Sequence, residues 1–307
     1  KKYIRSHHID ANQKAKVWFY LIEIDINNID KKLIERYRCI KNQWEKIRYS
    51  QFKRTDLFKE HIDKLKNEIY KFKQKLLTVV YDFTILKITF NIIMSITQIY
   101  YDFHSHYHEI LYLIRVFYSI FVKDVVYDKE NLENDEPFFV INDETTVNSE
   151  TFESLVFWSM LVLIEKGRIK QVLASIDSND FENITITISD FLYVVDPILF
   201  YSYLYQNNNK ILEFIPEITM AMSGTLALCD CSDLWIAALS ADNISQFLNF
   251  YLLSVLLMTF PPEVFTNSSK QNIQPIQKKI QMFDHWEIMK LAFKLQDSYP
   301  DLMKQKT

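Results

Sequence analysis

Glycine is almost absent from this chain: only Gly167 and Gly224 occur among 307 residues, and the first proline is Pro137. Glycine reaches positive φ without a Cβ clash, so phosphate-binding loops, nucleophile elbows and tight hairpins depend on it. No glycine-rich nucleotide loop, G-x-S-x-G, H-E-x-x-H or EF-hand pattern occurs. The sequence therefore argues against these enzyme classes. It predicts a stack of helices whose surfaces carry the function, with no catalytic residue and no cofactor.

Cysteine is also scarce. The chain has Cys39, Cys229 and Cys231, and one residue separates the last two, which is poor geometry for a disulfide and is not the C-x-x-C spacing of zinc knuckles. We expect small buried side chains here and an intracellular, reducing compartment. The chain starts without methionine or a signal-peptide core, so we expect a fragment of a longer protein.

Neither a long apolar run nor a strong charge of one sign is present. The longest apolar run, 247–260, is shorter than the ~20 residues that a bilayer requires, so no transmembrane segment is expected. Apolar residues make up 49% of the chain and its net charge is −4, which is a globular profile. This charge disfavours nucleic acid as the main partner. No small-molecule substrate is predicted either.

The first 123 residues read as helices. Leu33, Tyr37, Ile40, Trp44 and Ile47 recur at three- and four-residue steps, and apolar helical stretches follow at 76–103 and 107–123. Residues 31–75 hold 15 Lys and Arg against 6 Asp and Glu. The excess favours a solvated helix face, with a basic binding face as the alternative.

The clearest break in the pattern is the segment 124–150. Ten acidic residues and one lysine, Lys129, lie between Asp124 and Glu153, with Pro137 among them. This composition predicts an acidic loop or a partly disordered connector.

After the connector, the sequence gives clearer start and stop signals for individual helices. Ser149 is a candidate N-cap of a helix that ends before Gly167, and a second helix over 168–176 follows at once. The run 184–188 has strand propensity, but its surroundings favour helix. Further helices are expected at 198–206, 208–223, 232–240, 243–260 and 270–297, with Asp242 as a cap. The predicted fold is all-α, an irregular α-solenoid without a fixed-period repeat, divided into 1–123, the connector 124–150, and 151–307.

A histidine cluster is the strongest candidate for metal chemistry. On a continuous helix His104 and His108 would share one face at i,i+4, a spacing that can chelate Zn²⁺, whereas His106 would point away. No third ligand is evident nearby, so a polar helix end is the favoured interpretation and no metal site is predicted. Aromatic residues of 200–205 can stack bases in principle, but without neighbouring Lys or Arg they are expected to pack between helices.

One part of the chain resembles a known family. Residues 157–169 read FWSMLVLIEKGRI, and this run resembles a helix pair of the eighty-five-kilodalton nucleoporin family. These are short-arm scaffolds of the Y-shaped nuclear pore subcomplex. The layout of 191–197, 218–228, 234–242 and 247–260 is similar as well, so the resemblance covers about 152–265. The chain departs from the family at Ser240-Ala241, where a glycine is usual. Only 17–26 could supply an N-terminal strand, and it could equally be helix.

The resemblance implies an ancestral coatomer element fold of trunk, crown and tail. It further implies a non-enzymatic scaffold of the nuclear pore outer ring, at the nuclear envelope, that supports mRNA export and protein import. The implied partners are a WD-repeat propeller and other helical nucleoporins. The alternative is an adaptor subunit of a vesicle-coat or proteasome-lid-like assembly. Partners would contact the crown-like part near 152–260, where the candidate contact residues are Phe157, Trp158, Leu161, Trp235, Phe247 and Tyr251.

Overall fold

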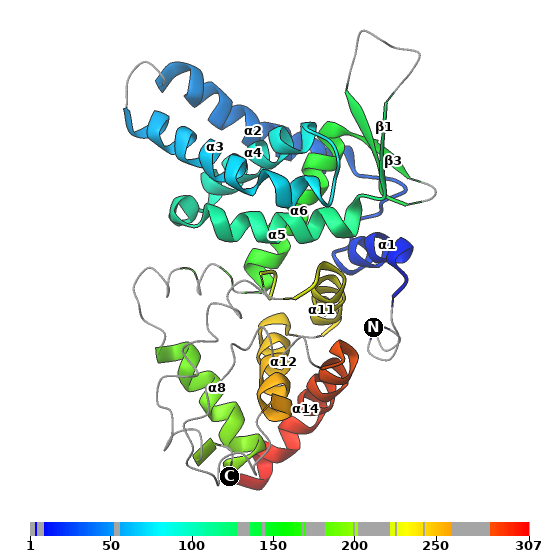
Figure 1. The fold of residues 1–307 in the computed structure, drawn as a ribbon, viewed down its shortest axis with the longest axis vertical. Helices are drawn as coiled ribbons and strands as arrows, with labels where there is room; N and C mark the ends of the chain where they lie inside the picture. The colour runs from blue at the N-terminus through cyan, green and yellow to red at the C-terminus, as the bar shows by residue number, and fades with distance from the viewer. Residues whose placement is uncertain are drawn as a thin grey trace. The chain divides into compact units, whose positions relative to one another are not determined.

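The structure is a computed structural model, and it is mostly helical (Figure 1). It describes residues 4, 9–51, 56–127, 136–142, 145–167, 169, 173, 182–198, 200–201, 222–224, 226–241, 243–259 and 283–306. The chain divides into two compact units: the first unit is 9–165, and the second unit is 166–307 with residues 1–8. The helices of the first unit are α1 (Ala11–Leu21), α2 (Lys31–Gln51), α3 (Asp56–Leu77), α4 (Thr84–Ile99), the 3₁₀ helix η1 (Tyr101–Ser105), α5 (Tyr107–Phe121) and α6 (Ser149–Lys166).

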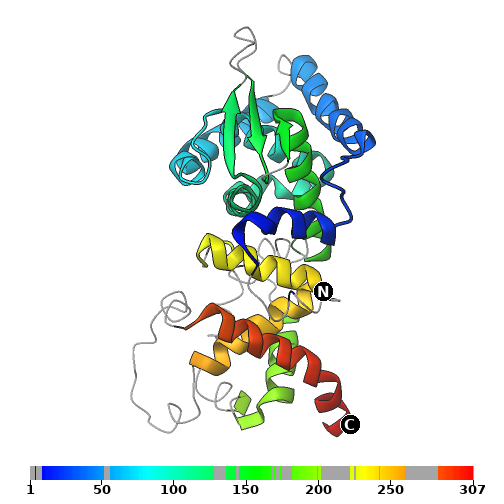
Figure 2. The same cartoon turned by 90° about the vertical axis from the view of Figure 1, so that its right-hand side faces the viewer.

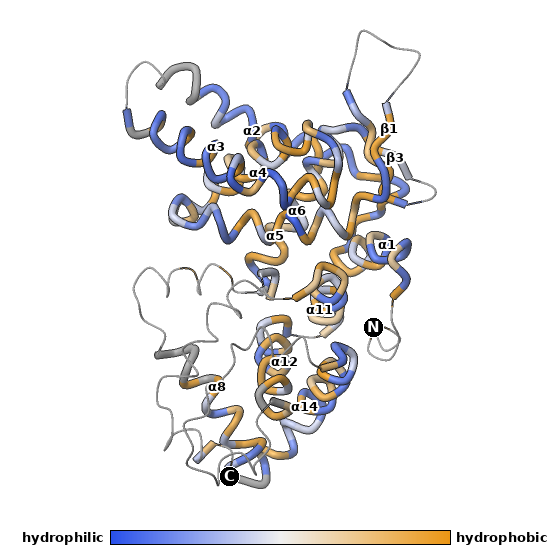
Figure 3. The backbone as a smooth tube through the Cα atoms, in the orientation of Figure 1, coloured by the Kyte–Doolittle hydropathy of each residue, from blue (hydrophilic) through white to orange (hydrophobic). Residues whose placement is uncertain are grey.

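Helix α6 is the central element of the first unit. Its residues are apolar on all sides and almost continuously buried from Phe152 to Ile164, as expected for a helix with neighbours all round. Phe157 lies 4.8 Å from Tyr37 of α2 between ring centroids, and Ser159 accepts a 3.0 Å hydrogen bond from Nε1 of Trp18 in α1. The peripheral helices α2 and α3 are largely hydrophilic, whereas α4, α5 and α6 are largely hydrophobic (Figure 3).

Three short strands form an antiparallel sheet in the first unit (Figure 2). Phe139 pairs with Val125 on one side and Val147 on the other. Its ring is fully buried and stacks on Phe152 of α6 at 4.2 Å, with 10° between the ring planes. The strands are β1 (Asp124–Tyr127), β2 (Pro137–Val140) and β3 (Thr146–Asn148).

This sheet differs from the acidic loop expected at 124–150. The described part of the segment has strands, because buried side chains alternate with exposed ones along β2 and β3 and Phe139 packs on Phe152 of α6. The segment therefore lies inside the first compact unit, and the division between the units falls after Glu165.

At the end of helix α1, a residue other than glycine takes the left-handed backbone conformation that glycine usually provides. At the end of α1 the left-handed position is taken by Glu23, at φ 63°, and the amide of Ile24 donates to the Phe19 carbonyl at 2.9 Å. The stretch 17–26 is thus helix to Leu21 and then a turn.

Helix α6 is capped by Asn148, whose Oδ1 accepts from the amide of Thr151 at 2.9 Å. The predicted cap Ser149 instead donates to the carbonyl of Pro137 at 3.0 Å.

The described helices of the second unit pack through aromatic rings. Phe191 stacks on Phe250 at 5.1 Å, and Tyr299 meets both rings edge-on. The hydroxyl of Tyr251 lies 2.9 Å from Nδ1 of His285. The run 184–188 is helical, as predicted, since it lies inside α8. These helices are α8 (Glu182–Val195), α11 (Leu228–Ser240), α12 (Ile244–Thr259) and α14 (His285–Lys306).

Several predicted features lie outside the described residues: most of the helices at 168–176, 198–206 and 208–223, the part of 270–297 before residue 283, and the cap Asp242. Within the described part of the chain, no helix combines the length and apolar character needed to span a bilayer, in agreement with the sequence.

Candidate functional site

The residues predicted to contact partners are mostly buried. Phe157, Leu161, Trp235, Phe247 and Tyr251 are at most 9% exposed. Trp158 is half-buried, and its Nε1 donates to the carbonyl of Leu33 at 3.1 Å. In this structure these aromatic and leucine side chains pack within their own units, and their role as partner contacts stays a prediction.

A buried carboxylate, Glu153, connects three helices of the first unit. Its side chain is 4% exposed, and its Oε1 accepts from the Tyr37 hydroxyl and, at 2.7 Å, from Nζ of Lys41. Its Oε2 accepts from Nδ2 of Asn91 at 2.8 Å. Burial and the neighbouring Glu153 charge raise the pKa of Tyr37. The phenol therefore remains a proton donor to the carboxylate, and the group ties α2 and α4 to α6.

The structure does not form the His104 and His108 pair that was weighed as a metal site, and His104 lies at a polar helix end, the interpretation favoured from the sequence. His104 lies in η1 and His108 in α5, and the two helices are separated at His106. The ring of His104 instead meets that of His61 of α3, with centroids 3.7 Å apart, and both rings lie within hydrogen-bonding distance of the Tyr107 hydroxyl. His108 packs on Phe72 and Tyr112.

His61 is held neutral at physiological pH. Burial, then the nearby His104 and Lys64, lower its pKa to about 4. Among the described residues, no group of three or more His, Cys, Asp and Glu side chains is arranged to hold a metal ion. Cys229 is exposed and Cys231 is buried at the start of α11, and neither forms a disulfide.

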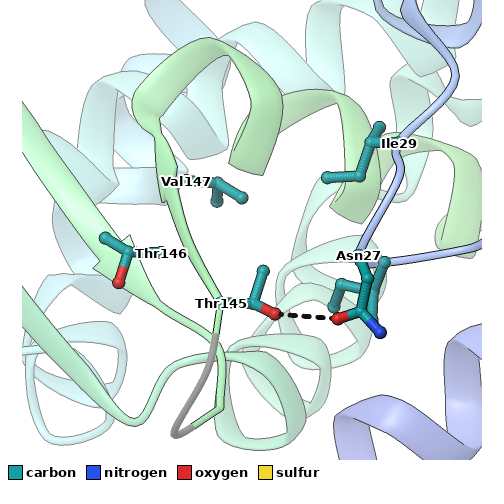
Figure 4. Close-up of a pocket in the computed structure, with 6 residues that line it drawn as sticks. Asn27, Ile29, Thr145, Thr146 and Val147 are labelled. Atoms are coloured by element: carbon teal, nitrogen blue, oxygen red, sulfur yellow. Dashed lines mark hydrogen bonds between the residues drawn. The ribbon is translucent and has the colours of Figure 1, made fainter.

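An open pocket of about 350 Å³ lies beside the first residues of β3 (Figure 4). Thr145 Oγ1 and Asn27 Oδ1 are 3.4 Å apart at its rim. No charged side chain lines it, so it offers two threonine hydroxyls, an amide and shape but no general acid or base. Its lining residues are Ile26, Asn27, Ile29, Thr145, Thr146 and Val147.

Exposed aromatic rings gather around the turn between α3 and α4. Tyr70 is 74% exposed, Tyr81 93% and Phe83 63%. Nζ of Lys73 lies 4.7 Å from the Phe83 ring centroid and 5.8 Å from that of Tyr70, so one ammonium group lies between two rings. Sequence reasoning missed this group because Tyr70 and Phe83 are 13 positions apart and belong to different helices.

Comparison with models of known protein families finds no match, and comparison with curated proteins finds none either. The likeness to a scaffold nucleoporin family therefore depends only on the residues given above.

Proposed function

We propose that this chain is a non-catalytic helical scaffold that binds protein partners. The observation that carries the proposal is that Glu153, a buried carboxylate, has a structural role. This buried ionisable group is occupied by donors from two other helices, so its polar chemistry holds the fold together. The open pocket beside β3 adds no acid or base among its lining residues, so nothing there would activate its threonine hydroxyls.

Exposed apolar side chains of the second unit supply a surface for such partners. Ile186 is 48% exposed, Tyr193 41%, Ile198 72% and Tyr201 50%, all in or directly after α8. The rings of Tyr193 and Tyr201 lie 6.2 Å apart between centroids, and large exposed apolar residues that lie together are typical of protein-interaction sites.

The specific form of the proposal is a scaffold of the nuclear pore outer ring, with an irregular α-solenoid architecture that supports mRNA export and protein import. It rests on the resemblance of 157–169 and the layout of 234–260. In support, helices α6, α11 and α12 occupy the stretches in which that resemblance requires helices. The proposed partners are a WD-repeat propeller and other helical nucleoporins.

An affinity pull-down of the tagged chain from nuclease-treated extract tests this function. We expect WD-repeat propellers and helical nucleoporins in the eluate, and we expect Ile198→Asp with Tyr201→Asp to deplete them. Tyr20→Asp is the matched control, because Tyr20 is 77% exposed but lies on α1 of the first unit. An eluate without these proteins would contradict the nuclear pore assignment. Partners retained by the double variant would contradict the role of this surface.

A further inference from the structure

We infer that the first unit binds single-stranded nucleic acid on one surface, by stacking bases on exposed rings and pairing phosphates with lysines. The surface, called here the α3–α4 surface, consists of Lys66, Tyr70, Lys73, Tyr81, Phe83 and Lys87. This activity is separate from the proposed protein scaffold.

The aromatic part of the surface fits bases. Three rings that are 63–93% exposed lie within two helix ends and the turn between them. Each nucleobase offers a flat face that can stack on a ring exposed to solvent. Tyr70 and Phe83 flank the ammonium group of Lys73, so two stacked bases would leave their linking phosphate near a cation.

The charged part of the surface fits phosphates. Lys66 and Lys87 are exposed one helical turn from Tyr70 and Phe83, respectively. Asp82, the acidic residue within the turn, is buried and accepts hydrogen bonds from Thr84 and from the Tyr127 hydroxyl. The cations therefore face solvent while this carboxylate is occupied within the protein.

The net charge of −4 does not contradict this inference, because it averages two oppositely charged regions. Residues 31–75 have an excess of nine positive charges, and the acidic segment 124–153 offsets it. A protein partner is the weaker match, because lysine is depleted in the cores of protein interfaces, whereas interleaved lysines and aromatic rings are typical of single-strand binders.

Fluorescence anisotropy with labelled 15-nucleotide oligo(U) and oligo(dT) tests the inference on the whole chain, with a duplex of equal length as comparison. Both single strands should bind, and the duplex should bind more weakly because its bases are already stacked. Tyr70→Ala with Phe83→Ala should weaken single-strand binding at least tenfold. Tyr20→Ala, a tyrosine of similar exposure on α1, should leave Kd within twofold.

The salt dependence of Kd measures the phosphate contacts separately from base stacking. Replacing Lys66, Lys73 and Lys87 by glutamine should reduce the slope of log Kd against log salt concentration by about 2, since each phosphate contact to a single strand contributes about 0.7. Lys16→Gln, an exposed lysine of α1, should leave the slope unchanged. Circular dichroism melts of every variant separate lost binding from lost folding.

Three outcomes would overturn the inference. They are no binding of either single strand by the wild-type chain, equal weakening by Tyr20→Ala, and ring-dependent binding of a 15-residue poly-glutamate peptide at least as tight as that of oligo(U). The last would assign the surface to acidic protein segments. Because the pull-down uses nuclease-treated extract, it can succeed or fail independently of this experiment.

Discussion

Glu153 is the single residue whose removal should most destabilise the first unit. Truncation to alanine removes the shared acceptor of the buried Tyr37 hydroxyl and of the Lys41 ammonium, whose side chain is 21% exposed. Breaking a buried ion pair by removing one partner costs about 3 kcal/mol or more. Glu153→Ala should therefore lower the free energy of unfolding by about 3 kcal/mol, measured by urea titration with tryptophan fluorescence.

Glu150 is the matched control for that variant. It lies one turn earlier on α6 and pairs with Arg38 at 2.6 Å, but the two side chains are 38% and 51% exposed. Solvent screens such a pair, so Glu150→Ala should destabilise far less than Glu153→Ala. If the two variants lost the same free energy of unfolding, the buried contacts of Glu153 would be no stronger than the exposed pair of Glu150 and Arg38.

The pH dependence of stability should report on His61. Its pKa is about 4 in the folded chain, lowered mainly by burial, against about 6.5 for an unfolded histidine. Between these values the unfolded state binds more protons, so stability is fully present above about pH 6.5 and falls as pH drops toward 4. Urea midpoints should fall less between pH 7 and pH 5 in His61→Gln than in the wild type. If the urea midpoint of His61→Gln fell with pH as steeply as that of the wild type, His61 would not be the cause of this pH dependence.

Local pattern could not predict these residue contacts. The sequence places Glu153 only among the acidic residues that follow Asp124, yet its partner Tyr37 is 116 positions away. His104 and His108 would share a face only in one continuous helix, and the break at His106 moves His104 toward His61. Partners distant in sequence are set by tertiary packing, on which a periodicity of three or four residues gives no information.

At the scale of the elements, substitutions in strand β2 test most directly whether the acidic segment is part of the core. Phe139 is fully buried against Phe152, whereas its neighbour Phe138 is 37% exposed on the opposite face. Phe139→Ala should lower the free energy of unfolding by about 3 kcal/mol, and Phe138→Ala by less than about 1 kcal/mol. Calorimetry or urea titration measures both. Similar losses from the two variants would indicate a loop with no preferred inward face.

Long amphipathic helices were predicted well, but the sheet was not. Helices α2, α3 and α5 each follow an apolar period over 15 residues or more, which local sequence records clearly. The strands are only three or four residues long and lie among acidic residues that dominate the composition. Their stability comes from stacking on α6, which no short window of sequence contains.

At the scale of the whole molecule, the division after Glu165 predicts which fragment folds alone. Residues 9–165 include α6 together with the elements of the first unit that contact it, among them α1, α2 and β2. This fragment should unfold in one cooperative transition by circular dichroism. A fragment of 1–123, the boundary expected from the sequence, would lack Phe152 and Phe157 and should be molten or aggregated in size-exclusion chromatography. A cooperative transition for 1–123 alone would contradict the central role of α6.

The position of α6 has a consequence for biosynthesis. The helix that fills the middle of the first unit is the last of its elements to leave the ribosome, after some 140 residues of the unit have already emerged. Until then Tyr37 and Phe139 lack the rings of Phe157 and Phe152, and Nε1 of Trp18 lacks its acceptor Ser159, so the nascent chain exposes apolar surface that α6 later covers. Chaperone protection during translation should thus be greatest just before residue 149 emerges and decline once Glu165 has cleared the exit tunnel.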